Sequence, residues 1–398
     1  MYLSLIVCSR SFGAALALLA VVGCSGGGGK GFGGAAGTAG AGGLAGAGAS
    51  GGVPGQGGGG GGGGSPGGAG NLAAIEAILV ARAAAAGVSD LGLSIWDAQD
   101  HLVYEKMLGT FTPDTRVAVA SASKLVAGLV IFDLIRKGPL TLDSTTGAVL
   151  GWTGANASIT LRHLLSFTSG LPRETTCTVN PLVTLAACAS TVEMATPGAP
   201  PGASFAYGST HLLVAGAMAE TVSGQSWADL FASTLRSPFG LPPDVAYFTG
   251  PRQAVGMINP LIAGGLRASV NEYRDFLAVA FHRGAYGGVT IGTPALFDEQ
   301  TREPFPDVPI EYSPWPARRY GLTSWLLCDT PTTGCAQLAS PGAFGFTPWY
   351  DRAAGYYAIL GMQLETTDQD ERGGQFAVML QQELAPLIAA VITGAAAP

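Results

Sequence analysis

A serine and a lysine, Ser121 and Lys124, lie three residues apart inside an otherwise apolar run. The run covers residues 117–132 and consists mainly of aliphatic residues, so it predicts a buried helix that continues to about Arg136. Side chains three residues apart share one face of a helix, so the hydroxyl and the amine can meet. Burial lowers the pKa of a lysine, and a neutral amine can accept a proton from the serine. The run therefore predicts a core helix with a lysine-activated serine nucleophile.

A Ser-x-x-Lys pattern is short enough to occur by chance, and a second interpretation stays open, in which Lys124 extends from a core helix to water. Only four of the twenty basic residues are lysines, at positions 30, 106, 124 and 137. Lys124 alone among them lies in a long apolar run, where an unpaired charge is costly. This placement favours the functional interpretation.

The first 24 residues predict a targeting segment. Arg10 supplies a positive charge, and residues 12–23 form an apolar stretch too short to span a bilayer. The small residue before Cys24 resembles the lipobox of bacterial lipoproteins, which implies cleavage before Cys24 and lipidation of its thiol. An ordinary secretory peptide is the alternative. The lipobox predicts a lipid anchor in the cell envelope, on the periplasmic face or the outer membrane, and the alternative predicts secretion.

Residues 25–70 are mostly glycine with some alanine, which predicts a flexible linker because such a segment buries too little apolar surface to offset its ordering entropy. Residues 71–398 are long enough for one large domain or two joined ones. A net charge of -7 and a pI near 5.1 argue against nucleic acid as a partner.

Four cysteines of this region form two close pairs, Cys177 with Cys188 and Cys328 with Cys335. Outside the cytoplasm, two local disulfides are the simplest interpretation. A zinc site is less favoured, because no histidine lies near either pair and the Cys-x-x-Cys spacing is absent. We therefore expect no metal and no cofactor.

The order of the expected elements predicts an α/β (α+β) fold, with an antiparallel sheet built from both chain ends, flanked by helices. Residues 71–136 and 317–398 would form this part, and residues 137–316 a helical insert. Ser269 is expected to cap a helix within the insert. The expected helices and strands are a helix over 71–86, strands over 91–96 and 102–106, strands over 320–327, 343–349 and 356–364, and a last helix from Gln375 that kinks or ends at Pro386.

Three further segments resemble motifs of one family. Residues 164–172 read Leu-Leu-Ser-Phe-Thr-Ser-Gly-Leu-Pro, residues 205–209 read Phe-Ala-Tyr-Gly-Ser, and residues 340–345 read Ser-Pro-Gly-Ala-Phe-Gly. With the Ser-x-x-Lys pattern, they resemble the serine β-lactamase and penicillin-binding-protein superfamily, and most closely its class C β-lactamase-like group of esterases and peptidases. The resemblance covers residues 71–398 and implies a β-lactamase/transpeptidase-like fold. Phe167 stands where the family usually has histidine.

The resemblance implies a role for each matching residue. Ser121 would be the acylated nucleophile, Lys124 its general base, and Tyr207 a second acid or base. The backbone N–H groups of Ser121 and Ala343 would form an oxyanion hole. The residues implied to bind substrate are Ser209, Ser340 and Gly342. Tyr207 as a half-buried aromatic residue and Ser340 as a plain strand residue remain the alternatives.

One departure from the family bears on the substrate. Ser340 offers a neutral hydroxyl where a cation is usual, which disfavours β-lactams and D-Ala-D-Ala termini relative to neutral esters and amides. Arg173 or Arg267 could restore the charge, and Trp315, Trp325 and Trp349 could line an apolar pocket or belong to the core.

We therefore expect an acyl-enzyme serine esterase that acts on small neutral acyl substrates, with a small-molecule ester, amide or peptide as its partner. A D-Ala-D-Ala-type peptidase or weak β-lactamase is the alternative among enzymes. A catalytically inactive binding protein of the cell envelope is the alternative outside them, because the second and third motifs are altered.

Overall fold

The computed structural model describes residues 66–249, 258–315, 319–328, 334–364 and 372–395 of the chain. The expected signal sequence with Arg10 and Cys24, and all but the end of the glycine-rich linker, lie outside these ranges. The helices are α1 (Pro66–Ala86), α2 (Ser123–Lys137), α3 (Thr146–Leu150), α4 (Leu161–Leu165), α5 (Leu185–Glu193), α6 (Thr210–Ser223), α7 (Trp227–Phe231), α8 (Val270–Phe281), α9 (Pro294–Gln300) and α10 (Arg372–Thr393).

A seven-stranded antiparallel sheet forms the centre of one part of the molecule, in the order β10-β11-β12-β13-β14-β1-β2. Leu93 of β1 lies opposite Leu360 of β14, so strands from the two ends of the chain are neighbours. The strands of this sheet are β1 (Leu91–Asp97), β2 (Leu102–Leu108), β10 (Arg319–Tyr320), β11 (Trp325–Leu326), β12 (Gln337–Ala339), β13 (Thr347–Asp351) and β14 (Tyr356–Met362). The predicted antiparallel sheet built from both chain ends is confirmed.

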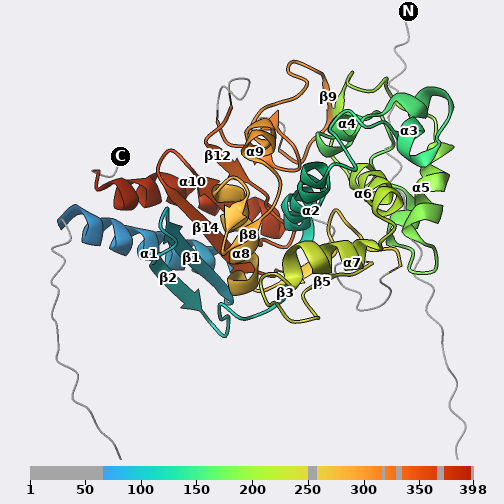
Figure 1. Ribbon diagram of the computed structural model, residues 1–398. Coiled ribbons are helices and arrows are strands. Elements are labelled where there is room, and N and C mark those ends of the chain that lie inside the picture. The colour runs from blue at the N-terminus through green and yellow to red at the C-terminus, as the bar shows by residue number, and fades with distance from the viewer. Residues whose placement is uncertain (1–65, 250–257, 316–318, 329–333, 365–371, 396–398) are drawn as a thin grey trace, which may run out of the picture. The chain divides into compact units, whose positions relative to one another are not determined.

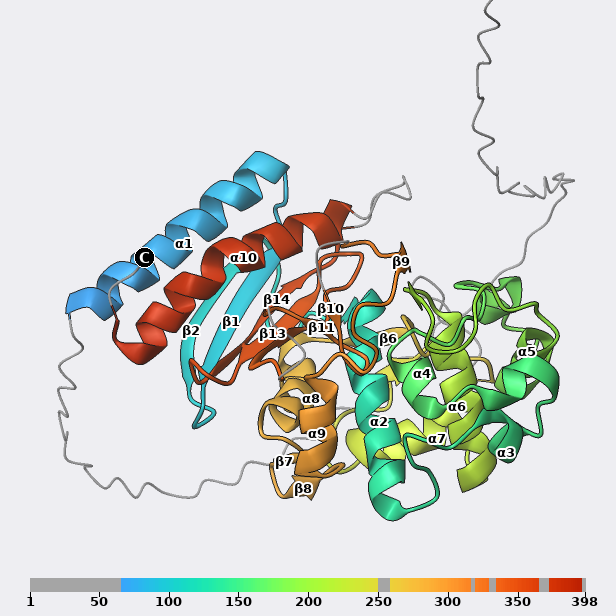
Figure 2. The same ribbon diagram turned by 90° about the horizontal axis from the view of Figure 1, so that it is seen from above.

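Helices cover both faces of the sheet. Figures 1 and 2 show α1 and α10 side by side along one face, where Leu91, Leu93 and Ile95 of β1 pack against them. The alternate residue Trp96 packs with the core on the other face, as the two-residue period of a strand requires. There α8 contacts β13 and β14. α10 is long and apolar enough to cross a membrane, but Leu380, like several of its neighbours, is buried against α1 and the sheet.

The second part of the molecule consists of short helices, α3 to α7, beside α2 (Figure 2). The smaller sheets are β3 (Val117–Ala118) with β6 (Leu266–Ala268) and β5 (Ala246–Tyr247), β4 (Phe205–Ala206) with β9 (Ile310–Tyr312), and β7 (Ala285–Tyr286) with β8 (Val289–Thr290). Ser269 caps α8 through a reciprocal capping box with Glu272, as the sequence predicts. Both predicted disulfides are present, Cys177–Cys188 and Cys328–Cys335.

Several expected boundaries were wrong. α1 begins at Pro66, inside the expected linker, because proline fits the first turn of a helix. α8 packs on the sheet although the sequence places it in the helical insert. α10 continues through Pro386, because buried residues on both sides, Leu384 and Ile388, hold the helix against the sheet.

The third-motif region also differs from expectation. Residues 343–346 form a turn and not the start of a strand, since Gly345 has φ +100° and the chain reverses between β12 and β13. Ser340 therefore follows the end of β12. The expected strand over 320–327 is divided between β10 and β11, because the chain turns at Thr323 with φ +61°.

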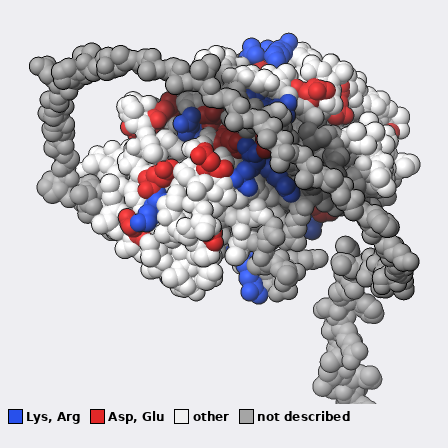
Figure 3. Space-filling model, turned by 90° about the horizontal axis from the view of Figure 1, so that it is seen from below, with Lys and Arg blue, Asp and Glu red and all other residues white. Residues whose placement is uncertain are grey.

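Charged side chains are sparse on the surface. Figure 3 shows one face, on which acidic and basic side chains lie in small mixed groups within uncharged surface. The described ion pairs likewise bring acidic and basic side chains together in small groups. Arg116, for example, contacts both Asp244 and Glu272.

Candidate active site

Ser121 lies in the segment that leads into α2, the helix of Lys124, and hydrogen bonds from several elements hold this segment in place. A short 3₁₀ turn, Ala120–Ala122, precedes α2, and Ala120 has a positive φ of 47°, a strained conformation for a residue with a Cβ atom. The Ser123 hydroxyl accepts a hydrogen bond from the backbone N–H of Leu266 at 3.0 Å. The buried hydroxyl of Tyr273 donates to the Ala122 carbonyl at 2.7 Å. These contacts fix the backbone around Ser121.

Lys124 contacts Ser121 as the spacing predicts. The Lys124 Nζ donates to Ser121 Oγ at 3.0 Å and to the Ala263 carbonyl at 2.8 Å. Lys124 is 3% exposed, so the interpretation in which it extends to water is wrong. Its Nζ also lies 4.7 Å from the centre of the Tyr207 ring. The structure thus brings together all three residues that the sequence predicts to be catalytic.

Tyr207 lies within a cluster of aromatic rings. Phe167 meets it edge to face at a centroid distance of 5.2 Å, and Trp325 lies at 5.0 Å. Tyr320 lies at 5.8 Å, and burial raises its pKa well above the ordinary value, with a smaller contribution from Tyr207. Such close packing restricts the orientation of the Tyr207 ring.

A small pocket opens beside these residues, with an empty space of about 260 Å³ that includes the part open to solvent. The described residues that line it are Ser121, Tyr207, Pro314, Trp315, Pro341, Ala343 and Gly374. None of these lining residues is an aspartate, glutamate, lysine or arginine. Ser121 and Ala343, the two residues predicted to form the oxyanion hole, lie on the same pocket. Of the three tryptophans considered in the sequence, Trp315 lines the pocket, whereas Trp325 and Trp349 are buried in the core.

The three residues predicted to bind substrate have distinct surroundings. Ser340 is buried and its hydroxyl donates to the backbone carbonyl of Ser121 at 3.2 Å. The Ser209 hydroxyl donates to Glu174 Oε1 at 3.2 Å, and its backbone N–H donates to the same atom at 3.0 Å. A role in substrate binding stays a prediction for both serines.

Gly342 lies directly against the segment before the nucleophile. A Cβ atom at this position would lie 2.2 Å from the Val119 carbonyl oxygen, far inside contact distance. The backbone of Val119 therefore explains why a residue without a side chain occupies this position.

Gly342→Ala is therefore expected to lower the free energy of unfolding by about 1–3 kcal/mol and to reduce activity, because the turn must move away from Val119. Thermal unfolding and ester hydrolysis measure the two effects. Gly198→Ala is the matched control, since the closest atom to its added Cβ lies at 3.9 Å. Equal behaviour of the two variants would contradict the steric argument.

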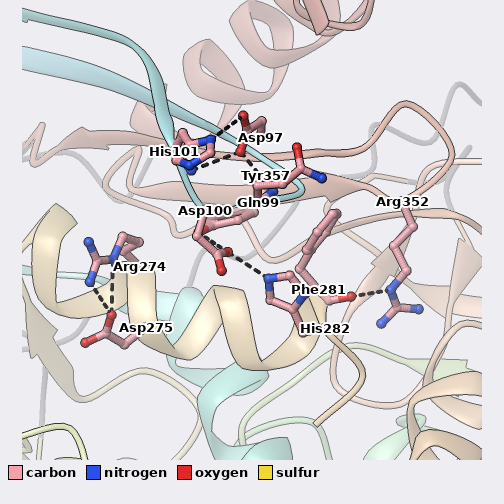
Figure 4. Close-up of polar contacts among 10 residues, drawn as sticks. All are labelled: Asp97, Gln99, Asp100, His101, Arg274, Asp275, Phe281, His282, Arg352 and Tyr357. Atoms are coloured by element: carbon pink, nitrogen blue, oxygen red, sulfur yellow. Dashed lines mark hydrogen bonds and ion pairs between the residues drawn. The ribbon is translucent and has the colours of Figure 1, made fainter. Parts of the chain in front are cut away.

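Histidines were expected to be structural or surface groups. Figure 4 shows two of them: His101, in the turn between β1 and β2, contacts Asp97, and His282, at the end of α8, contacts Asp100 Oδ1 of that turn through Nε2 at 2.7 Å. His163 caps α4 with Thr160. In the part of the chain that the structure describes, no group of three or more histidine, cysteine, aspartate or glutamate residues could hold a metal ion.

The fourth histidine, His211, lies inside the protein. It is completely buried beside the site, and its Nε2 lies 2.8 Å from the carbonyl of Ala206, the residue before Tyr207. Burial lowers its pKa from 6.5 to about 4; the hydrogen bond to Ala206 opposes this shift, and the charge of Lys124 adds to it. The signal in the sequence is its position four residues after Tyr207, near the start of an apolar helix.

This pKa predicts a pH-dependent stability. His211 is neutral in the folded state and takes up a proton more readily when unfolded, so stability should fall as pH decreases from 6.5 toward 4. The contribution over this window is about 3 kcal/mol. Urea unfolding at several pH values measures it, as the difference between the wild type and His211→Gln. Parallel pH curves for the two proteins would show that His211 is not the source.

The chain was compared with known families, curated proteins and solved structures. The family model described as Beta-lactamase matches residues 80–383. Penicillin-binding protein 4 of Amycolatopsis lactamdurans is 30% identical over 143 residues, which is 33% of this chain and 36% of that protein. The chain thus aligns with only about a third of the length of this curated relative.

Solved structures have the same fold. A candidate β-lactamase from Bacteroides dorei superposes with a TM-score of 0.67 and 24% identity, over 78% of this chain and 98% of that one. EstCE1, described as a hydrolase with promiscuous acyltransferase activity, gives a TM-score of 0.60 at 17% identity, over 79% and 98%. Simvastatin synthase from Aspergillus terreus gives 0.59 at 17% identity, over 82% and 98%. The predicted β-lactamase/transpeptidase-like fold is therefore confirmed.

Proposed function

The chain belongs to the β-lactamase family, and from this premise we propose that it is a serine hydrolase that forms an acyl-enzyme on Ser121. One observation carries the proposal: a lysine that is 3% exposed donates to the serine hydroxyl at 3.0 Å. Burial favours the neutral amine form of a lysine, and in that form Lys124 can accept the proton of the pocket-lining Ser121 hydroxyl.

The proposed reaction has two stages. Ser121 Oγ attacks the carbonyl carbon of the substrate while its proton passes to Lys124, and the backbone N–H groups of Ser121 and Ala343 stabilise the oxyanion. The tetrahedral intermediate collapses, and the leaving alcohol takes a proton from the Lys124–Tyr207 pair. Water then attacks the acyl group, with the same pair as general base, and releases the carboxylic acid and free Ser121.

We propose small neutral esters as the substrates. The pocket of about 260 Å³ has a lining without charged side chains among the described residues, and proline and tryptophan make up much of its wall. Such a wall favours a short apolar acyl group over a carboxylate. A carboxylate would lose its hydration in the pocket, and no described lining residue supplies a cation to compensate for that loss. We accordingly place the chain with the esterases of the class C β-lactamase-like group.

The test combines labelling with substrate comparison. A fluorophosphonate probe should modify Ser121, which peptide mass spectrometry locates, and p-nitrophenyl acetate or butyrate should be hydrolysed. A fluorescent penicillin should not acylate the protein under the same conditions. Absence of both labelling and turnover would favour the non-catalytic binding protein.

The match to penicillin-binding protein 4 keeps a peptidase as the second candidate. Stable acylation by penicillin, together with hydrolysis of a D-Ala-D-Ala peptide, would favour this candidate over the esterase.

We also propose that lipidation of Cys24 anchors the protein in the cell envelope, with residues 25–65 as a tether. Support comes from the sequence alone, through the apolar stretch and the small residue before Cys24. The full chain expressed in a bacterial host should then fractionate with membranes, and Cys24→Ala should not. Mass spectrometry of the mature N-terminus separates lipidation from ordinary cleavage.

A further inference from the structure

His211 makes two hydrogen bonds from opposite sides of its buried ring. Nε2 lies 2.8 Å from the Ala206 carbonyl oxygen, and Nδ1 lies 2.8 Å from Ser169 Oγ. Ser169 Oγ also accepts a hydrogen bond from the Leu171 N–H at 3.2 Å. The imidazole therefore connects the loop after α4 to the end of β4.

The partners determine the tautomer of the ring. A carbonyl oxygen only accepts hydrogen bonds, so Nε2 must carry the proton that points to Ala206. The ring is completely buried, which disfavours a second proton, so Nδ1 accepts from the Ser169 hydroxyl. Hydrogen bonds then run in one direction, from Leu171 through Ser169 and His211 to Ala206, and each polarises the next.

The last of these hydrogen bonds reaches the carbonyl of Ala206, the residue before Tyr207. β4 is only two residues long, so it needs contacts beyond its own pairing with β9. The Ala206 N–H donates to the Phe167 carbonyl at 3.0 Å, and the Ala206 carbonyl accepts from His211. Phe167 also packs edge to face on the Tyr207 ring. The residue before Tyr207 is thus held through both its N–H and its carbonyl.

We propose that His211 is a positioning residue of the reaction, which fixes the Ala206 peptide and so holds Tyr207 in place over Lys124. This inference rests on the proposed function, since it assigns His211 a part in the same acyl transfer. A displacement of about 1 Å in a catalytic group can lower the rate about 10²-fold, so small movements of the Tyr207 backbone are sufficient.

Three substitutions separate the two hydrogen bonds. His211→Phe removes both and should lower kcat for p-nitrophenyl butyrate by about tenfold to a hundredfold, with KM within about threefold. His211→Gln retains an N–H donor for Ala206 and should recover most of the lost kcat. Ser169→Ala leaves the bond to Ala206 but removes the donor to Nδ1 that polarises the ring, so its kcat should lie between the two.

His282→Phe is the matched control, because this histidine contacts Asp100 at the hairpin tip and not the site (Figure 4). It should lower stability without changing kcat per folded molecule. Circular dichroism and thermal unfolding establish the folded fraction of every variant. If His211→Phe fails to fold, the kcat values of His211→Gln and Ser169→Ala, each compared with the wild type, decide whether His211 is a positioning residue.

The outcomes distinguish this inference from the proposed function. Wild-type protein without ester turnover and without fluorophosphonate labelling of Ser121 would remove the proposed function, and the role of His211 with it. Active wild-type protein with a folded His211→Phe variant of unchanged kcat would overturn the positioning role alone. An equal loss in His211→Phe and His211→Gln would also contradict it, because the second variant keeps the donor.

Discussion

Replacement of Ser121 by alanine is expected to abolish ester hydrolysis, with a loss in kcat of at least about 10³-fold. The hydroxyl is the atom that would form the covalent bond to the acyl group, so no neighbouring group can replace it. The fold should remain intact, because Ser121 lies at a pocket wall and alanine fits the same backbone. Initial rates and thermal unfolding of both proteins measure the two effects.

Ser123→Ala provides the matched control two residues away. The Ser123 hydroxyl accepts from Leu266 inside the protein and does not line the pocket, so its loss should lower stability and leave hydrolysis within about tenfold of wild type. If Ser121→Ala retained a rate similar to that of Ser123→Ala, Ser121 would not be the nucleophile.

Replacement of Lys124 by methionine is expected to reduce kcat by about 10²- to 10⁴-fold. Methionine has similar length and no proton acceptor of comparable strength, so Ser121 would lose its base. The change in stability should be small, because loss of the bond to Ala263 costs about 1–3 kcal/mol and removal of a buried polar amine offsets it. Activity should therefore fall while the melting temperature changes little.

Lys106→Met is the corresponding control. Lys106 pairs with Glu76 near the surface and takes no part in the site, so hydrolysis should be unchanged. A Lys124→Met variant with kcat within tenfold of wild type would require another base for Ser121.

Local patterns in the sequence predicted much of the fold. The strands predicted over residues 91–96 and 102–106 correspond to β1 and β2, and the apolar run around Ser121 corresponds to the 3₁₀ turn Ala120–Ala122 and α2. These predictions succeed because the repeat of apolar residues that marks a helix or strand can be recognised within a short stretch of sequence. The two disulfides were predictable for a similar reason, since each joins cysteines close in sequence.

Features that depend on distant contacts were not predictable. α10 passes through Pro386 because the sheet and α1 stabilise it, and propensity alone would end the helix there. Residues 343–346 were predicted as the start of a strand, because local sequence does not reveal that the chain turns at Gly345, which has φ +100°. In each case tertiary packing overrode a local preference.

The same distinction holds for the site. The contact between Ser121 and Lys124 follows from helical spacing, so the sequence predicts it directly. The position of Tyr207 beside Ser121 and Lys124 could be predicted only from the family resemblance, because no local sequence pattern brings these distant segments together. The contact between His211 and Ala206 joins a helix to the strand before it through a ring nitrogen, which no residue pattern specifies.

The pairing of β1 with β14 has a consequence for the order in which this chain can fold. The strand that contains Leu93 is synthesised early, and its partner, which contains Leu360, is synthesised near the end. The central sheet therefore cannot form completely until nearly the whole chain has been synthesised. The short helices between them, such as α5 and α6, contact one another across a shorter length of chain and can form sooner. On our proposal that the chain is exported to the cell envelope, this delay would keep the polypeptide open enough to be threaded through a membrane channel.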